Sequence, residues 1–169
     1  MERVDLWDEN RTKVLRTIVR GEAILSHERS IGVHCYIVNQ QGQILIQKRS
    51  MQETHFQGWW STLGGAVTHG NSSLATVKFE AREELGLEFA EDQIKWLLSF
   101  KRAKDIVDVY VIHAEVDLAK IVMAPDEVID VRWATFDEIE SMIAEHTFIQ
   151  QPYLNLLKTS LDICNTNFF

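Results

Sequence analysis

Stretches in which apolar residues alternate with polar ones, or run together, predict a series of short strands. Residues 31–38 are mostly β-branched and aromatic, as is typical of a strand, and the alternating residues 43–49 follow a turn at 39–42. We therefore expect these two segments to form a β-hairpin. The same reasoning predicts three further strands, at residues 94–102, 106–116 and 128–134.

Apolar residues at helical spacing predict three helices. The first covers about residues 73–85, with Ser72 as its N-cap. A Thr-x-x-Glu capping box should open a second helix, over residues 135–145. A third is expected at residues 151–163, where leucines recur at helical spacing. Several strands combined with these helices predict an α/β (α+β) fold, with a mixed β-sheet sandwiched between helices.

Residues 1–29 give the weakest pattern. We expect one or two strands there, in an N-terminal extension that packs on the domain, and a homodimer contact is one role open to it. Residues 30–169 would then form a single domain. A chain of 169 residues can bury a real core, because a domain of about 150 residues hides roughly 68–70% of its unfolded surface.

Composition indicates a globular protein and limits its partners. Hydrophobic residues make up 46% of the chain and charged residues 25%, which is ordinary for a soluble domain. The net charge of −8 disfavours binding to a nucleic-acid polymer, which needs basic surface. A nucleotide substrate remains compatible with this charge, because a divalent cation can bridge two anions.

Neither a membrane segment nor a zinc site is expected. No apolar stretch reaches the roughly 18 residues of a membrane span, and the N-terminus has no signal pattern, so we expect a cytoplasmic location. Cys35 lies in an apolar run and should be a buried thiol. Cys35 and Cys164 are far apart and neither forms a C-x-x-C unit, so zinc is not expected.

Three glutamates near the end of the first helix are the main candidates for chemistry. Glu80, Glu83 and Glu84 are spaced to share one helix face, where like charges cost roughly 0.2–0.5 kcal/mol per pair. Acidic groups near a helix C-terminus also oppose the helix dipole. A solvated acidic face is one interpretation. The other is a site for Mg²⁺ or Mn²⁺, which prefer carboxylate oxygens.

The residues around this trio resemble the signature of the Nudix hydrolase family, G-x5-E-x7-R-E-U-x-E-E-x-G-U, where U is a bulky aliphatic residue. Gly65 takes the position of the first glycine, and the three glutamates take the positions of the last three in the signature. Gly86 and Leu87 match its end, and Trp60 and Gly64 match the run that precedes it. The resemblance extends from about residue 20 to about residue 140, and it implies an α/β/α sandwich.

Three positions depart from that signature. Asn71 replaces its first glutamate, Phe79 replaces its arginine, and the small Ala81 replaces a bulky aliphatic residue. Without the arginine, the carboxylates have less charge compensation, so they should depend more on the metal or have raised pKa values. The alternative is that the signature has decayed and the protein is a non-catalytic sensor of a nucleotide or sugar phosphate.

The resemblance implies a hydrolase that cleaves a diphosphate bond in a nucleoside diphosphate linked to another moiety. Water would attack phosphorus, with Mg²⁺ or Mn²⁺ held by Glu80, Glu83 and Glu84 and by a backbone carbonyl near Gly65. A general base is also needed. It could be Glu83 or Glu84, or Glu127 in the loop before the last strand, which could equally be a solvated loop acid.

Candidates for substrate binding lie at the end of the second strand and in the following loop. Arg49 could bind phosphate oxygens through its guanidinium, and its neighbour Lys48 is the other cation at that strand end. Alternation does not decide which of the two points inward. Trp59 could stack on a ligand. His69 and Asp108 are weaker candidates for residues near the site.

An isomerase is the second enzymatic hypothesis. Residues 20–49 look closest to the branch of the superfamily that includes isopentenyl-diphosphate isomerase. That enzyme uses a cysteine, followed two residues later by a histidine, in the glycine turn, and here Gly64 and Ala66 stand at those positions. The hydrolase is therefore favoured, with a small-molecule diphosphate as its partner, but the loops carry no readable substrate code.

Overall fold

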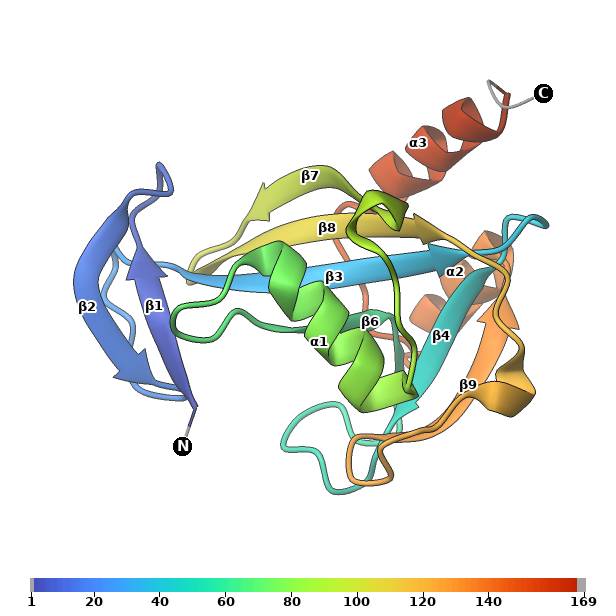
Figure 1. Cartoon of the computed structure of the whole chain (residues 1–169), viewed down its shortest axis with the longest axis horizontal. Coiled ribbons are helices and arrows are strands. Elements are labelled where there is room, and N and C mark those ends of the chain that lie inside the picture. Colours follow the sequence, from blue (N-terminus) through green and yellow to red (C-terminus); the bar gives the residue numbers. More distant parts are fainter. Residues whose placement is uncertain (1, 167–169) are drawn as a thin grey trace.

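A mixed seven-stranded sheet forms the centre of the computed structural model, which describes residues 2–166 and the side chains of residues 2–161. Five strands pair in the order β5-β4-β3-β8-β7, while β6 pairs with β3 and β9 with β4 (Figure 1). Their bounds are β3 Ser30–Val38, β4 Ile44–Arg49, β5 Trp60–Ser61, β6 Leu63–Ala66, β7 Ile94–Lys101, β8 Asp105–His113 and β9 Val128–Ala134.

The middle of the sheet is a parallel pair of strands. β3 and β8 run side by side from Ser30–Asp105 to Val38–His113. The other pairs are antiparallel. The predicted hairpin between β3 and β4 exists, but the strands pair only at Val38–Ile44 and then diverge. The edge of β3 left by this divergence is taken by β6.

The glycine run at Gly64 and Gly65, which was described above as a turn, forms strand β6. Gly64 faces His34 across the β3–β6 pair, and a Cβ on Gly64 would lie 2.5 Å from the Val33 carbonyl oxygen. Glycine is depleted in strands, so propensity argued against this assignment. The close approach of the two backbones explains why glycine is needed at this place.

Helices cover both faces of the sheet (Figure 1). Helix α1, Ser73–Leu85, packs Val77, Ala81 and Leu85 on one face. Helices α2, Phe136–Ala144, and α3, Leu154–Thr166, cover the other face through the side chains that the structure describes for them. The predicted class, a mixed sheet between helices, is confirmed.

The caps of α1 explain why its predicted bounds agree with the structure. Ser72 Oγ accepts a hydrogen bond from the Ala75 amide at 3.1 Å. Gly86 has a φ of 66°, a left-handed conformation, and the Leu87 amide bonds to the Ala81 carbonyl at 2.9 Å. Both motifs satisfy backbone groups that a helix end leaves free. They fix the length of the helix that carries Glu80 and Glu84.

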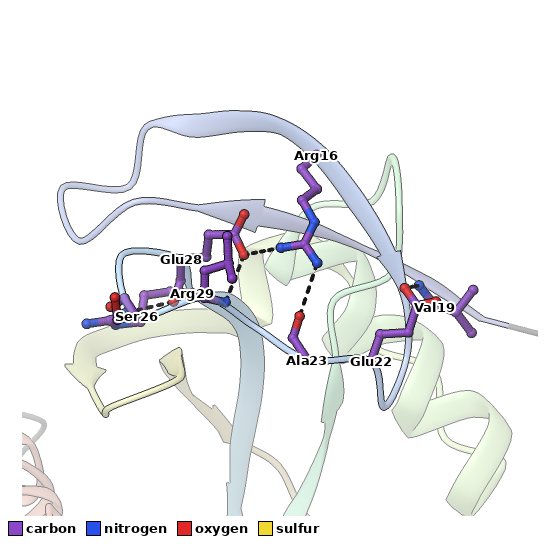
Figure 2. A network of polar contacts seen from close by, with 8 residues as sticks. Arg16, Val19, Glu22, Ala23, Ser26, Glu28 and Arg29 are labelled. Carbon is purple, nitrogen blue, oxygen red and sulfur yellow. Dashed lines mark hydrogen bonds and ion pairs between the residues drawn. The ribbon is translucent and has the colours of Figure 1, made fainter.

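Residues before the sheet form a separate two-stranded hairpin of β1, Arg3–Trp7, and β2, Lys13–Val19, in agreement with the expectation of one or two strands. Arg16 extends from β2 to Glu28 and to the Ala23 carbonyl (Figure 2). Backbone bonds between Trp7 and Arg29 join β1 to the chain just before β3. The hairpin is thus bonded to the segment that leads into the sheet.

Two polar contacts attach the hairpin elsewhere. The buried Asp5 carboxylate accepts hydrogen bonds from Lys13, Thr17, His69 and the Gly70 amide. Burial acts to raise the Asp5 pKa, but these donors hold it well below its usual range. Because His69 and Gly70 precede α1, Asp5 connects the hairpin to the start of the glutamate helix.

The second contact reaches the central sheet. Arg11 donates to the fully buried Asp108 of β8 through Nη1 and Nη2, at 2.5 and 2.9 Å, and Ser99 donates to the same carboxylate. Asp108 is therefore engaged in holding the hairpin.

Two further expectations concern the rest of the chain. Cys35 is buried, as predicted, whereas the side chain of Cys164 lies outside the described ones. Within residues 2–166, no helix has both the length and the apolar character needed to cross a bilayer.

Candidate functional site

Three carboxylates converge at the end of α1. Glu80, Glu84 and Glu127 each offer an oxygen, and these oxygens all lie within 4.8 Å of one another. Glu80 and Glu84 are one helical turn apart, which places them on one face. Glu127 comes from the loop before β9, so the group joins residues that are more than 40 positions apart in sequence.

Backbone hydrogen bonds hold the Glu127 loop against the helix end. The Ala124 amide donates to the Glu84 carbonyl at 3.0 Å, and the Val122 amide donates to the Leu85 carbonyl at 3.1 Å. The Ser50 amide bonds to the carbonyl of Glu127 itself at 2.8 Å. Carbonyls that the end of a helix leaves free therefore serve to position the third carboxylate.

Glu83 lies outside this group. Its side chain is about half exposed, and its Oε1 is 3.3 Å from Arg82 Nη2. With about 3.6 residues per turn, positions three and four after Glu80 fall on opposite sides of it, and only the fourth turns toward the loop. The structure thus brings together Glu80, Glu84 and Glu127, and a role for Glu83 stays a prediction.

Burial changes the acidity of the two helix carboxylates. Glu84 is buried, which raises its pKa to about 8; Glu80 and Glu127 add to this shift and Gln47 opposes it. Burial also raises the pKa of Glu80 to about 7, with a further contribution from Glu127 and an opposing one from Arg20. Raised pKa values were expected, but their main cause is burial rather than the missing arginine.

The donors at this site fit a divalent cation. Carboxylate oxygens are the hard ligands that Mg²⁺ and Mn²⁺ prefer. Gln47 Nε2 donates to Glu84 Oε2 at 2.7 Å, which orients the Gln47 amide. Its Oε1 is then buried with no hydrogen-bond partner among the described residues. Such an acceptor costs about 1–3 kcal/mol when left alone, and it is an oxygen that water or a hydrated cation can satisfy.

Gln47 was not identified from the sequence. It follows three consecutive buried residues of β4 and is itself buried. A polar residue that ends a buried run is a weak signal, because only the position of Glu84 shows which group it meets. The same limit applies to every contact between distant segments.

Gly65, whose carbonyl was a predicted metal ligand, lies directly against the Glu80 carboxylate. A side chain at this position would overlap the Glu80 carboxylate, since even an added Cβ would collide with Oε1. Only glycine leaves room for Glu80 in this arrangement. Metal binding by the Gly65 carbonyl stays a prediction.

A cavity of about 280 Å³, which we call the arginine cavity, includes Gly65 in its wall. Three arginines line it, namely Arg20, Arg49 and Arg102. Arg49 was a predicted substrate-binding residue, and its guanidinium is held by Glu53 at 2.8 Å. Arg20 and Arg102 were not identified, because each stands just after a strand, where an exposed cation is ordinary.

The other predicted substrate-binding residues lie elsewhere. Lys48 Nζ lies 5.8 Å from the centre of the Trp60 ring, so it faces away from Arg49 along the alternating strand. Trp59 packs edge-on against Phe56, with ring centres 5.3 Å apart. Neither Lys48 nor Trp59 lines the arginine cavity. Their roles in binding stay predictions.

Two of the three positions that depart from the signature lie together beside Glu80, whereas the third, Ala81, is buried in the core. Asn71 and Phe79 line a second cavity of about 430 Å³, which also includes Glu80, His69 and Arg3. Phe79 is more than half exposed. The favourable charge that acts on Glu80 comes instead from Arg20, at the end of the hairpin. A cation from a distant segment thus partly offsets the raised pKa of Glu80.

Comparisons with known proteins agree with this architecture. The family model described as NUDIX domain matches residues 28–157. An uncharacterised Nudix hydrolase of Listeria innocua is 32% identical over 160 residues, which cover 93% of this chain and 94% of that protein. A crystal structure of DR0079 from Deinococcus radiodurans superposes with a TM-score of 0.77 at 27% identity, covering 94% of this chain and 98% of the other.

One relative bears on the isomerase hypothesis. An isopentenyl-diphosphate Delta-isomerase of Citrobacter koseri is 27% identical over 128 residues, 72% of this chain and 71% of that protein. The likeness is weaker than that to the Listeria protein. The choice between isomerase and hydrolase therefore depends on the residues of the site.

Proposed function

Because this chain belongs to the Nudix family, we propose that it is a metal-dependent pyrophosphohydrolase, which cleaves a diphosphate bond in a nucleoside diphosphate linked to another moiety. The observation that carries this proposal is the convergence of Glu80, Glu84 and Glu127 within 4.8 Å. Three carboxylates held so close repel one another unless protons or cations are shared among them. Mg²⁺ or Mn²⁺ is the proposed cofactor.

The three carboxylates have different surroundings, which suggests different roles. Glu84 and Glu80 are the more enclosed pair, so we assign them to holding the cation. Glu127 is exposed, which gives it access to solvent and makes it the proposed general base. When bound, a divalent cation supplies neutralisation of the diphosphate charge and a more acidic water.

The arginines would bind and orient the substrate. Arg49 is only partly exposed and already forms an ion pair with Glu53. A phosphate oxygen could replace that carboxylate, since a guanidinium binds either group with the same paired geometry. Such a contact would align the diphosphate with the carboxylates beside Gly65.

The glycines of β6 argue against the isomerase. Gly64 stands where the isomerase has its cysteine, and a Cβ there would lie 2.5 Å from the Val33 carbonyl oxygen and 3.0 Å from the His34 ring. A cysteine at Gly64 would require the β3–β6 pair to move apart. The proposed hydrolysis needs no thiol, because its nucleophile is water.

Phosphate release from a panel of nucleoside diphosphates, ADP-ribose, dinucleoside polyphosphates and sugar nucleotides tests the proposal, with Mg²⁺ or Mn²⁺ present. We expect turnover of at least one member and a loss of about 100-fold or more in Glu84→Gln, the range seen when a group that stabilises the transition state is removed. Glu91→Gln is the matched control, because Glu91 is an exposed carboxylate outside the group. Clear binding without any turnover would favour the sensor instead.

A further inference from the structure

Two buried polar atoms in the wall of the arginine cavity have no hydrogen-bond partner within residues 2–161. They are Ser61 Oγ and Gln151 Oε1, and both side chains are more than nine-tenths buried. Leaving such an atom unpaired costs about 1–3 kcal/mol. Two of them in one cavity therefore indicate a place where a ligand supplies the missing hydrogen bonds.

The two residues come from different segments that meet at the cavity. Ser61 is the last residue of β5, where it pairs with Gln47 of β4. Gln151 lies between α2 and α3, shortly after Ile149, whose amide donates to the Trp60 carbonyl at 2.9 Å. This backbone bond holds the 149–151 segment beside β5. The two unpaired atoms are thus fixed by the fold.

The cavity adjoins the carboxylate group on two sides. Gly65 is shared, since it lines the cavity and lies against Glu80. Ser61 pairs with Gln47, and Gln47 donates to Glu84. A diphosphate bound at the carboxylates would therefore have its attached moiety next to Ser61 and Gln151.

The charged groups of the cavity are paired. Arg20, Arg49 and Arg102 form ion pairs with Glu2, Glu53 and Asp105, at 2.7, 2.8 and 2.7 Å, so a phosphate would bind there by replacing a carboxylate. His34 also lines the cavity, and burial lowers its pKa to about 4, so it is neutral at physiological pH. The arginines suit phosphate oxygens, whereas Ser61, Gln151 and His34 present uncharged polar groups.

We propose that the arginine cavity binds the organic moiety of the diphosphate substrate, and that Ser61 and Gln151 select a moiety with hydroxyl or amino hydrogen-bond donors. A carbonyl oxygen such as Gln151 Oε1 only accepts, so the ligand has to donate. Sugars and nucleobases meet this requirement and a hydrocarbon chain does not. The inference rests on the proposed function, because it takes the carboxylates as the place of the diphosphate.

Three diphosphates test the selection. Isopentenyl diphosphate has no donor in its organic moiety, 5-phosphoribosyl diphosphate offers sugar hydroxyls, and UDP offers a sugar and a base. We expect the wild-type protein to prefer the two polar substrates by kcat/KM. A site with buried hydrogen-bonding groups rejects analogues that lack the matching group by as much as roughly 10⁴-fold.

Gln151→Leu and Ser61→Ala remove the two unpaired atoms. Each should lower kcat/KM for a polar substrate by about tenfold, mainly through KM, and leave isopentenyl diphosphate unaffected. Loss with both polar substrates identifies sugar hydroxyls as the donors, and loss with UDP alone identifies the base. Gln41→Leu, at an exposed turn position, is the control for the glutamine substitution. Thermal unfolding checks that each variant is folded.

The inference and the proposed function fail in different ways. If both variants treat polar and apolar diphosphates as the wild type does, ordered water satisfies Ser61 and Gln151, and the inference is wrong although the hydrolase remains. If neither these three diphosphates nor any member of the panel above turns over, the proposed function is wrong. Calorimetric titration with UDP then still tests the cavity, since weaker binding by Gln151→Leu would support it and equal binding would overturn it.

Discussion

The end of α1 and the N-terminal hairpin contribute to the same site in different ways. The helix packs Val77, Ala81 and Leu85 into the sheet and carries two carboxylates one turn apart. The hairpin has a small apolar cluster that also takes in Ala66 of β6, its Trp7 packs on the core beneath α1, and polar contacts of Asp5 and Arg11 attach it further. The helix supplies negative charge, and the hairpin supplies Arg20, the cation that acts on Glu80.

This difference shows that a charge from outside a local motif can act on the carboxylates of that motif. Phe79 stands on α1 where the family signature has arginine, and it faces outward. Arg20, which is ion-paired with Glu2, lowers the pKa of Glu80 only in part, from a segment that precedes the matched domain at residues 28–157. Part of the charge compensation of Glu80 thus comes from a part of the chain that the signature does not describe.

The largest effect is expected from a substitution that displaces a carboxylate of α1. In Gly65→Ala the new methyl group displaces the Glu80 carboxylate, so we expect kcat/KM for the best substrate to fall by about 100-fold or more. Circular dichroism should show that the fold is kept. Shortening the carboxylate in the double variant with Glu80→Asp should restore part of the loss. Full activity of Gly65→Ala would show that Glu80 does not need its present position.

The next prediction breaks the attachment of the hairpin. Arg11→Ala leaves Asp108 buried without its cation, and we expect the free energy of unfolding to fall by about 2 kcal/mol, less than the 3–5 kcal/mol of a fully buried pair because Arg11 is partly exposed. Urea unfolding measures this change. Adding Asp108→Asn should recover part of the stability, since the unpaired charge is then gone. Equal stability of Arg11→Ala and the wild type would contradict the prediction.

A smaller effect is expected from removing Arg20, the hairpin residue whose charge acts on α1. Arg20→Gln should raise KM by roughly fivefold, as expected for one partly exposed charged contact, and move the acid limb of the pH–rate profile to higher pH. Adding Phe79→Arg should move the acid limb back but leave KM raised, because residue 79 does not line the arginine cavity. An unchanged pH profile in Arg20→Gln would show that Arg20 binds substrate only.

The smallest effect concerns stability and pH. The folded-state pKa values of Glu80 and Glu84, about 7 and about 8, lie above the ordinary value of 4.5. Between pH 5 and 8 the folded protein therefore holds more protons than the unfolded chain, and without metal its stability should fall as pH rises. With a chelator present, the melting temperature of the wild type should fall between pH 5 and pH 8 by about a few degrees more than that of Glu84→Gln.

His34 contributes the opposite slope, because its folded-state pKa of about 4 lies below its ordinary value of 6.5. This contribution is common to both proteins, so the difference between them isolates Glu84. Addition of Mg²⁺ at pH 8 should raise the melting temperature of the wild type more than that of the variant. Parallel pH curves for the two proteins would contradict the raised pKa of Glu84.

Local signals explain what could be predicted from the sequence. The bounds of α1 follow from Ser72 and Gly86, which satisfy the helix ends within a few residues. The third helix begins at Leu154 rather than at residue 151, because Pro152 disfavours helical geometry in the residue before it. Pairing between distant segments left no such signal, as β6 and Gln47 show. Glu127 lies beside Glu84 because the loop before β9 bonds to the end of α1, and no spacing of residues along the sequence indicates this contact.

The backbone of Gly65 lies between the carboxylates and the arginine cavity, with no side chain to add to the distance between them. Under the proposed function, the scissile bond and the first recognised atoms of the substrate are separated only by the width of a backbone. Substrate length would therefore matter, because a compound with a long spacer between its phosphates and its polar group would place that group beyond Ser61 and Gln151. The length of this spacer, as well as the polarity of the group, would then decide which diphosphates this protein accepts.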